Sequence, residues 1–562
     1  MAGTQPEALK LKNEGNELFT NNDFSAAYHT YSAAIKLDPD SAVLYCNRAA
    51  CAYNLSRYLD ACTDARKATE LDPTYAKAWG RLAAQLLLIL QSMDRYTEAI
   101  NCWKRAIAAL PDENLTPAQA KQREGYESDL AAVEAKFEHM KANPKMPEGM
   151  LAYPNDSQDL RPWQRASRIV AELERKRFWR TCVSASHTGH REWERALTQL
   201  NAAHAVPGPR GEEGWFAYRG VLEGFTNALI ADERIFRMSD ANIFLEQLQR
   251  QMAWEAHDAK AWTAVGAQKV IEEIPGRLEN EGWSSVRPAL AVTVRSWILR
   301  AFLKDGLEGN PAGSLDVYTS ALEVLKWAAE KYKDVPSEER GTVLQPTFIR
   351  GVKAMRLNQY MKASLQTSTR ARLPLEGMIA GADELIEELK DVSMDADDAV
   401  ARGENLGFWY AFHRYPNAMA HGIRGYVFNK QALKLREEAG GLTPEAYDLF
   451  FNSADEYIQS AMLYPLDDSH HVWFFHCALE GQYNAEAPAW VLLRTLDEIS
   501  QDYPIAGALW EHSADWPQMK PALDRDMDMR EDLQSSIDAG DIDRDLPIKL
   551  KAMSTSELVM IM

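Results

Sequence analysis

Apolar residues recur at helical spacing through the first 111 residues, and the pattern repeats with a period of 34. Segments 8–41, 42–75 and 76–111 superpose when a four-residue insertion near residue 88 is allowed in the third. At repeat positions 4, 8, 11, 20, 24, 27 and 32, the first segment has Leu11, Gly15, Leu18, Ala27, Tyr31, Ala34 and Pro39. Position by position, the second segment has Tyr45, Ala49, Ala52, Ala61, Ala65, Ala68 and Pro73, and the third has Trp79, Ala83, Leu86, Ala99, Trp103, Ala106 and Pro111. This pattern predicts three pairs of antiparallel helices, with the insertion lengthening the third pair.

A period of 34 with this alternation of small and large residues is the signature of tetratricopeptide repeats. Small residues at positions 8 and 20 allow two helices to approach closely, while a proline near position 32 ends the second helix. Three such pairs bury a continuous core, and a terminal helix must cover its end. Residues 116–142 supply a long helix there. We therefore predict a three-repeat superhelix with a capping helix over residues 6–142.

The repeat positions that are not used for packing, chiefly 2, 5, 6 and 9 on the first helix of each pair, face the concave groove. They place Lys12 and Asn16 in the first repeat, Asn47 in the second, and Lys77 and Arg81 in the third. Lys77 and Arg81 are neighbours on one helix face with no acidic residue at that spacing, so they repel unless an anion lies between them. Lys, Asn and Arg are hydrogen-bond donors, which suits a carboxylate.

This set resembles the dicarboxylate clamp of tetratricopeptide co-chaperones such as the Hsp70/Hsp90-organising protein. The resemblance rests on KNEGNELF, LYCNRAA and AKAWGRLA, in which all five clamp positions match. It implies binding of the C-terminal Glu-Glu-Val-Asp tail of 70-kDa or 90-kDa heat-shock chaperones. By this resemblance, Lys12, Asn16 and Asn47 would hold the main-chain carboxylate, Lys77 the aspartate side chain, and Arg81 would reach back along the peptide. The alternative reading is that these are ordinary solvated residues.

The rest of the chain shows helical patterns without a recognised family. A proline-containing linker is expected at 143–162, an irregular helical-repeat body at 163–525 and a weakly ordered acidic tail at 526–562. Segments 314–332 and 443–465 look like degenerate helical repeats, and no run of alternating β-branched residues predicts a sheet. The predicted fold class is therefore all-α. The chain ends in Met-Ile-Met without a terminal aspartate, so its own end is a poor ligand for the clamp.

Charge, hydropathy and cysteine content limit the kinds of partner and the cellular compartment that we expect. The net charge is −20, but residues 1–111 hold 12 Lys and Arg against 12 Asp and Glu, so the whole acidic excess lies beyond them. Such a chain is a poor nucleic-acid binder. No apolar run approaches the ~20 residues that span a bilayer, so no membrane association is expected. Six cysteines, with Cys46, Cys51 and Cys62 among apolar neighbours, indicate small buried thiols in the reducing cytoplasm.

Stretches with catalytic or metal-binding residue types are few. One runs from His187 to Glu192 and includes His190, and a second contains Asp467, Asp468, His470, His471, His476 and Cys477. Neither has a spacing that forces ligands to converge on zinc, so we interpret them as ordinary surface and helix-end residues. Asp524, Asp526 and Asp528 have calcium-loop spacing but lack the glycine and glutamate of such a loop. We predict no catalytic residue, no cofactor and no metal.

The sequence thus favours a non-enzymatic co-chaperone or adaptor, which binds a chaperone tail through its clamp and a client or second protein through its body. One alternative is a scaffold whose repeat groove binds an internal peptide. Another is a metal-dependent enzyme that uses the histidine-rich stretch near residue 470.

Overall fold

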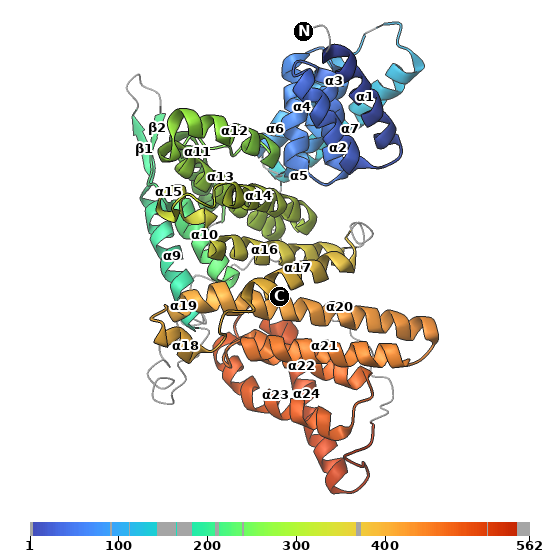
Figure 1. Cartoon of the computed structure of the whole chain (residues 1–562), viewed down its shortest axis with the longest axis vertical. Coiled ribbons are helices and arrows are strands. Elements are labelled where there is room, and N and C mark those ends of the chain that lie inside the picture. Colours follow the sequence, from blue (N-terminus) through green and yellow to red (C-terminus); the bar gives the residue numbers. More distant parts are fainter. Residues whose placement is uncertain are drawn as a thin grey trace. The chain divides into compact units, whose positions relative to one another are not determined.

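The computed structural model describes residues 4–89, 93–111, 113–142, 165, 183–207, 213–238, 241–366, 373–513 and 515–547. Its contacts divide the chain into two compact units, with the elements labelled in Figure 1. Unit 1 comprises residues 1–150 and 249–345, and unit 2 comprises residues 151–248 and 346–562. The expected linker at 143–162 lies outside the described residues, so the boundaries drawn around it stay a prediction.

The first part of unit 1 is the predicted superhelix of three tetratricopeptide repeats. Its helices are α1 (Thr4–Thr20), α2 (Phe24–Leu37), α3 (Ala42–Asn54), α4 (Tyr58–Leu71), α5 (Ala76–Ile89), α6 (Met93–Ala108) and the capping helix α7 (Pro117–Ala142). Helix α6 begins six residues before Ala99, whereas α2 and α4 begin three residues before Ala27 and Ala61. The insertion therefore adds about one turn to the start of α6.

Small residues allow the paired helices to approach, as the repeat pattern predicts. Ala27, Ala61 and Ala99 are fully buried. A Cβ atom on Gly15 would lie 2.8 Å from the Tyr31 ring, so only glycine lets α1 and α2 pack this closely. Helix α7 covers the last repeat through aromatic pairs with α6: the Tyr96–Phe137 ring centroids are 6.0 Å apart and those of Trp103–Tyr126 are 5.4 Å apart.

The second part of unit 1 is a set of helices that packs against α4. It comprises the second half of α11 (Ala241–Asp258), then α12 (Ala267–Glu281), α13 (Trp283–Glu308), α14 (Pro311–Lys331), α15 (Ser337–Arg340) and the short helix η3 (Thr342–Leu344). Both α12 and α14 contact α4, the second helix of the second repeat. The repeats are thus joined to a segment that lies more than 100 residues further along the chain.

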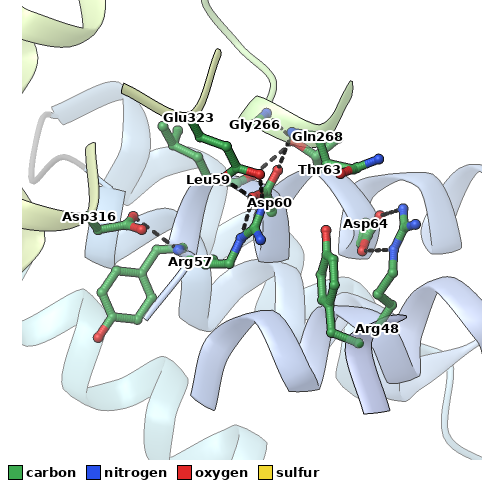
Figure 2. A network of polar contacts seen from close by, with 12 residues as sticks. Arg48, Arg57, Leu59, Asp60, Thr63, Asp64, Gly266, Gln268, Asp316 and Glu323 are labelled. Carbon is green, nitrogen blue, oxygen red and sulfur yellow. Dashed lines mark hydrogen bonds and ion pairs between the residues drawn. The ribbon is translucent and has the colours of Figure 1, made fainter. Parts of the chain in front are cut away.

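Polar groups at this contact cap each other's helices (Figure 2). The first residue of α4, Tyr58, donates its backbone N–H to Asp316 of α14 over 3.0 Å. In turn, Asp60 of α4 accepts a bond of 3.2 Å from the backbone N–H of Gln268, in the first turn of α12. Neither α4 nor α12 has a side-chain cap from its own preceding residue. Each helix start is therefore satisfied by a carboxylate from the other part of unit 1.

Close approach and ion pairs complete the same contact. Gly266 donates its N–H to the Thr63 hydroxyl over 2.9 Å, and a Cβ atom there would lie 2.6 Å from the backbone nitrogen of Asp60. Arg57 bridges Asp60 at 2.8 Å and Glu323 of α14 at 3.0 Å (Figure 2). A larger residue at position 266 cannot be accommodated without moving the helices apart.

Unit 2 holds the remaining described elements, which are helical apart from one pair of short strands. Its helices are α9 (Val183–Ala202), α10 (Val221–Ala231), η2 (Glu233–Ile235), the start of α11, α16 (Pro346–Leu365), α17 (Leu375–Leu389), α18 (Ala396–Ala401), α19 (Leu406–Trp409), η5 (Tyr410–Arg414), α20 (Tyr415–Ala439), α21 (Pro444–Leu463), α22 (Ser469–Asn484), α23 (Ala489–Trp510) and α24 (Trp516–Asp538). Strands β1 (His204–Pro207) and β2 (Glu213–Phe216) pair antiparallel, a feature that the sequence analysis missed. The all-α prediction is otherwise confirmed, and α14 and α21 match the two predicted repeat-like segments.

Consecutive helices from α20 to α24 pack in sequence order, as in a repeat array. Glycines again face aromatic rings: a Cβ on Gly425 would lie 2.8 Å from the Tyr457 ring, and one on Gly422 would lie 2.7 Å from the Phe474 ring. The body of the protein therefore uses the same device of small against large residues as the tetratricopeptide repeats, without their regular period.

The π-helical segment η5 joins α19 to α20 just before Pro416. Proline has no N–H and its ring clashes with the carbonyl four residues earlier, here that of Phe412. The wider turn relieves that clash. The Phe412 carbonyl instead accepts a hydrogen bond of 3.0 Å from Arg350 of α16.

The acidic end of the chain is more ordered than the sequence suggested. Residues 526–538, placed by the sequence analysis in a weakly ordered tail, form the second half of α24. The prediction failed because the charged residues hide a buried face, which includes Leu523, Asp526 and Leu533. Residues 548–562 lie outside the described residues. In the described part of the chain, no helix combines the length and the apolar character needed to cross a bilayer.

Candidate functional site

The five predicted clamp residues lie on three helices of the tetratricopeptide superhelix. Lys12 and Asn16 belong to α1, Asn47 to α3, and Lys77 and Arg81 to α5. The residues of each pair are four apart, so each pair shares one helix face. These are the first helices of the three repeats, and all five side chains remain at least partly exposed.

Asn16 and Asn47 are in direct contact. The Asn47 amide donates to the Asn16 side-chain oxygen, with a nitrogen-to-oxygen distance of 3.2 Å. The same oxygen accepts a bond of 2.7 Å from the hydroxyl of Tyr31 on α2. Burial raises the pKa of Tyr31 to about 12, although the positive charge of Arg81 and a hydrogen bond from Asn47 oppose that rise. The hydroxyl therefore keeps its proton and remains a donor at neutral pH.

Arg81 reaches from α5 to α3, next to Asn47. Its Nη1 donates to the backbone carbonyl of Cys46, and it lies 3.0 Å from the Cys46 sulfur. Cys46 itself is buried, as are Cys51 and Cys62, which confirms the expectation of buried thiols. The bond to Cys46 holds the Arg81 guanidinium against the helix that carries Asn47.

Of the three cations of this site, Lys12 and Lys77 have no partner among the described residues. Within the described part of the chain, no hydrogen bond or ion pair engages either ammonium group. The cations of the packing surfaces behave differently: Arg48 binds Asp64 through two bonds of 2.7 Å, and Arg66 lies 2.8 Å from Glu98. The groove thus carries positive charge that its surroundings do not neutralise.

The arrangement favours an anionic ligand with several acceptor oxygens. Two ammonium groups, one guanidinium and two carboxamides supply the donors. A carboxylate offers about four lone-pair sites, and hydrogen bonds to charged groups contribute roughly 1.5–3 kcal/mol each. The structure brings Asn16, Asn47 and Arg81 together, with Lys12 and Lys77 one helical turn away from Asn16 and Arg81 respectively.

Sequence reasoning missed the polar role of Tyr31. The repeat pattern assigned this residue to packing at position 24, and its ring is indeed buried with 1% exposure. Its hydroxyl nevertheless reaches a groove residue on the neighbouring helix. The choice of tyrosine instead of phenylalanine at this position was the available signal.

Most of the histidine-rich stretch is buried, so its interpretation as surface residues is wrong, whereas the interpretation as helix-end residues is confirmed for Asp468, the N-cap of α22. His471 lies between the carbonyl of Ala461 at 2.8 Å and Asp502 at 2.9 Å. His476 lies 2.7 Å from Asp526 of α24. Burial alone would lower the pKa of His476, but its hydrogen bond and attraction to Asp526 raise it.

The neighbouring acidic residue Asp468 is part of a separate ion cluster. It accepts two bonds of 2.9 Å from Arg234, whose guanidinium stacks 4.0 Å from the Trp510 ring centroid. Burial opposes ionisation of Asp468, yet Arg234 and His470 together hold its pKa well below the usual value. These contacts join α22 to the segment that follows α10.

The other candidate metal ligands are also dispersed. Asp524 accepts hydrogen bonds from Tyr503 at 2.7 Å and Lys520 at 2.6 Å, while Asp526 is hydrogen-bonded to His476. His190 lies 3.2 Å from Arg237, and the side chain of His187 lies outside the described residues. Across the described ranges, no group of three or more His, Cys, Asp or Glu residues is arranged to hold a metal ion.

Comparison with known protein families finds no match for the chain. Among curated proteins, it is 34% identical over 127 residues to small glutamine-rich tetratricopeptide repeat-containing protein 2 of Mycosarcoma maydis, covering 22% of this chain and 35% of that protein. It is 37% identical over 105 residues to the heat-shock protein cognate co-chaperone sgt12 of Aspergillus fumigatus, covering 18% and 29%. The tetratricopeptide region is similar to that of known co-chaperones.

A third relative is similar over a shorter stretch. The heat shock protein sti1 homolog of Schizosaccharomyces pombe is 43% identical over 79 residues, which cover 14% of this chain and 13% of that protein. The matched residues cover only 35%, 29% and 13% of the length of these three curated relatives. The similarity therefore concerns the repeats, and the helical body remains without an assigned family.

Proposed function

We propose that this protein is a non-enzymatic co-chaperone or adaptor that binds the free C-terminal tail of a 70-kDa or 90-kDa heat-shock chaperone in its tetratricopeptide groove. Lys12, Asn16 and Asn47 would bind the terminal carboxylate, Lys77 the side chain of the last aspartate, and Arg81 the peptide behind it. The larger helical part would hold a client or a second protein.

The observation that carries the proposal is the pair of unpartnered ammonium groups beside three converging donors. Lys12 and Lys77 have no acidic partner among the described residues, whereas the buried Arg48 and the half-buried Arg66 of the same repeats do. A surface that holds donors without acceptors is complementary to an anion. Co-chaperone relatives support the choice of a chaperone tail over other anions, since two of them carry heat-shock protein in their names.

The test is a calorimetric titration of the full chain with a peptide that ends in Met-Glu-Glu-Val-Asp. A second peptide, identical but amidated at its C-terminus, lacks the main-chain carboxylate. We expect a dissociation constant on the order of micromolar, about −8 kcal/mol, for the free peptide and a loss of at least tenfold on amidation. Lys77→Ala and Arg81→Ala should each remove most of the affinity.

A matched control is Lys10→Ala. Lys10 lies on α1 like Lys12, but it faces Glu7 at 3.9 Å and its side chain is 73% exposed. Removal of this cation changes the net charge as Lys77→Ala does, yet it should leave peptide affinity unchanged. Equal binding of the free and amidated peptides would contradict the clamp and favour a scaffold whose groove binds an internal segment.

A further inference from the structure

The two carboxamides of the groove are not equivalent. The Asn16 oxygen receives two hydrogen bonds from within the repeats, one from the Tyr31 hydroxyl and one from the Asn47 amide. In the described part of the chain, no residue engages the Asn16 amide nitrogen. Because a carboxamide is planar, holding its oxygen on the protein side directs its nitrogen away from those donors.

A free asparagine side chain can present either its oxygen or its nitrogen to a ligand. An oxygen turned toward a carboxylate would repel it, whereas the nitrogen supplies two N–H donors. Because Tyr31 and Asn47 both donate to the Asn16 oxygen, they prevent that oxygen from turning toward the ligand. Tyr31 contributes the shorter of the two bonds, 2.7 Å against 3.2 Å.

The tyrosine is itself well fixed for this task. Its ring is buried between α1 and α2 and lies against Gly15, the residue one position before Asn16. The absence of a side chain at position 15 lets the ring come close enough for its hydroxyl to reach the next residue. Gly15 is therefore part of the same arrangement.

We propose that Tyr31 is a positioning residue of the carboxylate site: it locks the Asn16 amide so that its N–H groups face the ligand. This inference rests on the proposed function, because it assigns a role within the same groove. It also defines the ligand group at Asn16 as an anionic acceptor, such as a terminal carboxylate, and not as a donor.

The first experiment compares the wild-type full chain with Tyr31→Phe, using the Met-Glu-Glu-Val-Asp peptide. The phenylalanine keeps the ring that packs on Gly15 and removes only the hydroxyl. We expect a loss of affinity of about fivefold to tenfold with little change in the melting temperature. Tyr28→Phe is the matched control, because it removes a hydroxyl from the same helix that has no hydrogen-bond partner in the described residues.

Two variants of Asn16 separate positioning from a general structural effect. Asn16→Asp keeps an oxygen for Tyr31 and Asn47 but replaces the N–H groups with a second, charged oxygen, so binding should be lost while the fold is retained. In an Asn16→Ala background, Tyr31→Phe should have no further effect on affinity. A separate loss of affinity in that background would overturn the proposed role of Tyr31.

The outcomes also distinguish this inference from the function on which it rests. Failure of the wild-type chain to bind the free peptide would overturn both. Binding by the wild type with unchanged affinity in Tyr31→Phe would overturn the positioning role alone. A normal affinity in Asn16→Asp would show that the Asn16 amide nitrogen does not face the ligand, which also contradicts the inference.

Discussion

Asn47 and Arg48 are neighbours in the sequence, yet they belong to two surfaces with opposite properties. Asn47 faces the groove, where five donors have few acceptors from the protein. Arg48 faces α4, is 5% exposed, and donates through Nε and Nη2 to Asp64 and through Nη1 to the Ser32 hydroxyl. On the α4 side, Arg48 and Arg57 are paired with carboxylates, and further bonds reach α12 and α14 (Figure 2), although the Tyr28 hydroxyl has no partner among the described residues.

The difference shows how one helical repeat can serve two purposes. A buried polar group must find its partner inside the protein, since an unmatched one is costly. A solvent-facing group is under no such requirement, so an excess of donors can persist there. Such an excess of donors is complementary to the anionic ligand proposed above.

The sharpest way to test this comparison is to remove a partner from each surface. Asp64→Ala leaves Arg48 buried without a counter-charge and should lower the free energy of unfolding by about 3–5 kcal/mol. Lys77→Ala, on the groove side, should change it by no more than about 0.5 kcal/mol. Denaturant unfolding of the two variants measures both values, and similar losses would show that the groove cations are also structural.

A smaller effect is expected at the contact between α4 and α14. Asp316→Ala removes the acceptor for the Tyr58 N–H, so it should cost about 1 kcal/mol, as loss of a helix cap does. Asp316→Asn keeps an acceptor and should not destabilise the protein at neutral pH.

The pH dependence of these two variants sharpens that prediction. Burial, together with the nearby charge of Asp60, raises the pKa of Asp316 well above its usual value. A carboxyl with a raised folded-state pKa stabilises the fold only at low pH, and that contribution is lost as the pH rises through it. Wild type should therefore lose stability relative to Asp316→Asn from about pH 4 upward. A constant difference across this range would contradict the assignment.

His476 provides a comparable test in unit 2. Its ring nitrogens lie 2.7 Å from Asp526 and 3.6 Å from Glu480. These two carboxylates raise the pKa of His476, whereas the positive charge of Arg525 lowers it. Because its folded-state pKa is raised, its ion pair stabilises the protein fully below about pH 6.5 and less as the pH rises through the folded value. The stability lost in His476→Gln should thus shrink as the pH rises from about 6 to about 9, as measured by thermal melting.

The smallest expected effect is a difference in salt dependence between the groove and the surface that faces α4. The groove is open to solvent, and the Debye length is about 10 Å at 0.1 M ionic strength. Peptide affinity should fall severalfold between about 0.05 M and 0.5 M salt, whereas the free energy of unfolding should change little because Arg48 and Asp64 are shielded. Salt-independent peptide binding would argue against a charge-based site.

Much of the repeat region could be predicted because its information is local. A period of 34 determines where helices begin and end, and positions within the period identify the groove residues. Contacts between distant segments follow no such rule: nothing in the sequence around Tyr58 indicates that Asp316 caps it. Similar reasons explain the missed pairing of β1 with β2 and the misplaced end of α24, whose buried face was concealed among charged residues.

The shared caps of unit 1 also have a consequence in time. Asp316 follows Tyr58 by 258 positions. A ribosome adds roughly 5–20 residues per second, so the interval between the two is on the order of 13–50 seconds. During synthesis, the repeats emerge long before the carboxylate that completes α4. Throughout that period, water must satisfy the first amides of α4, and the assembly of unit 1 can finish only when α14 arrives.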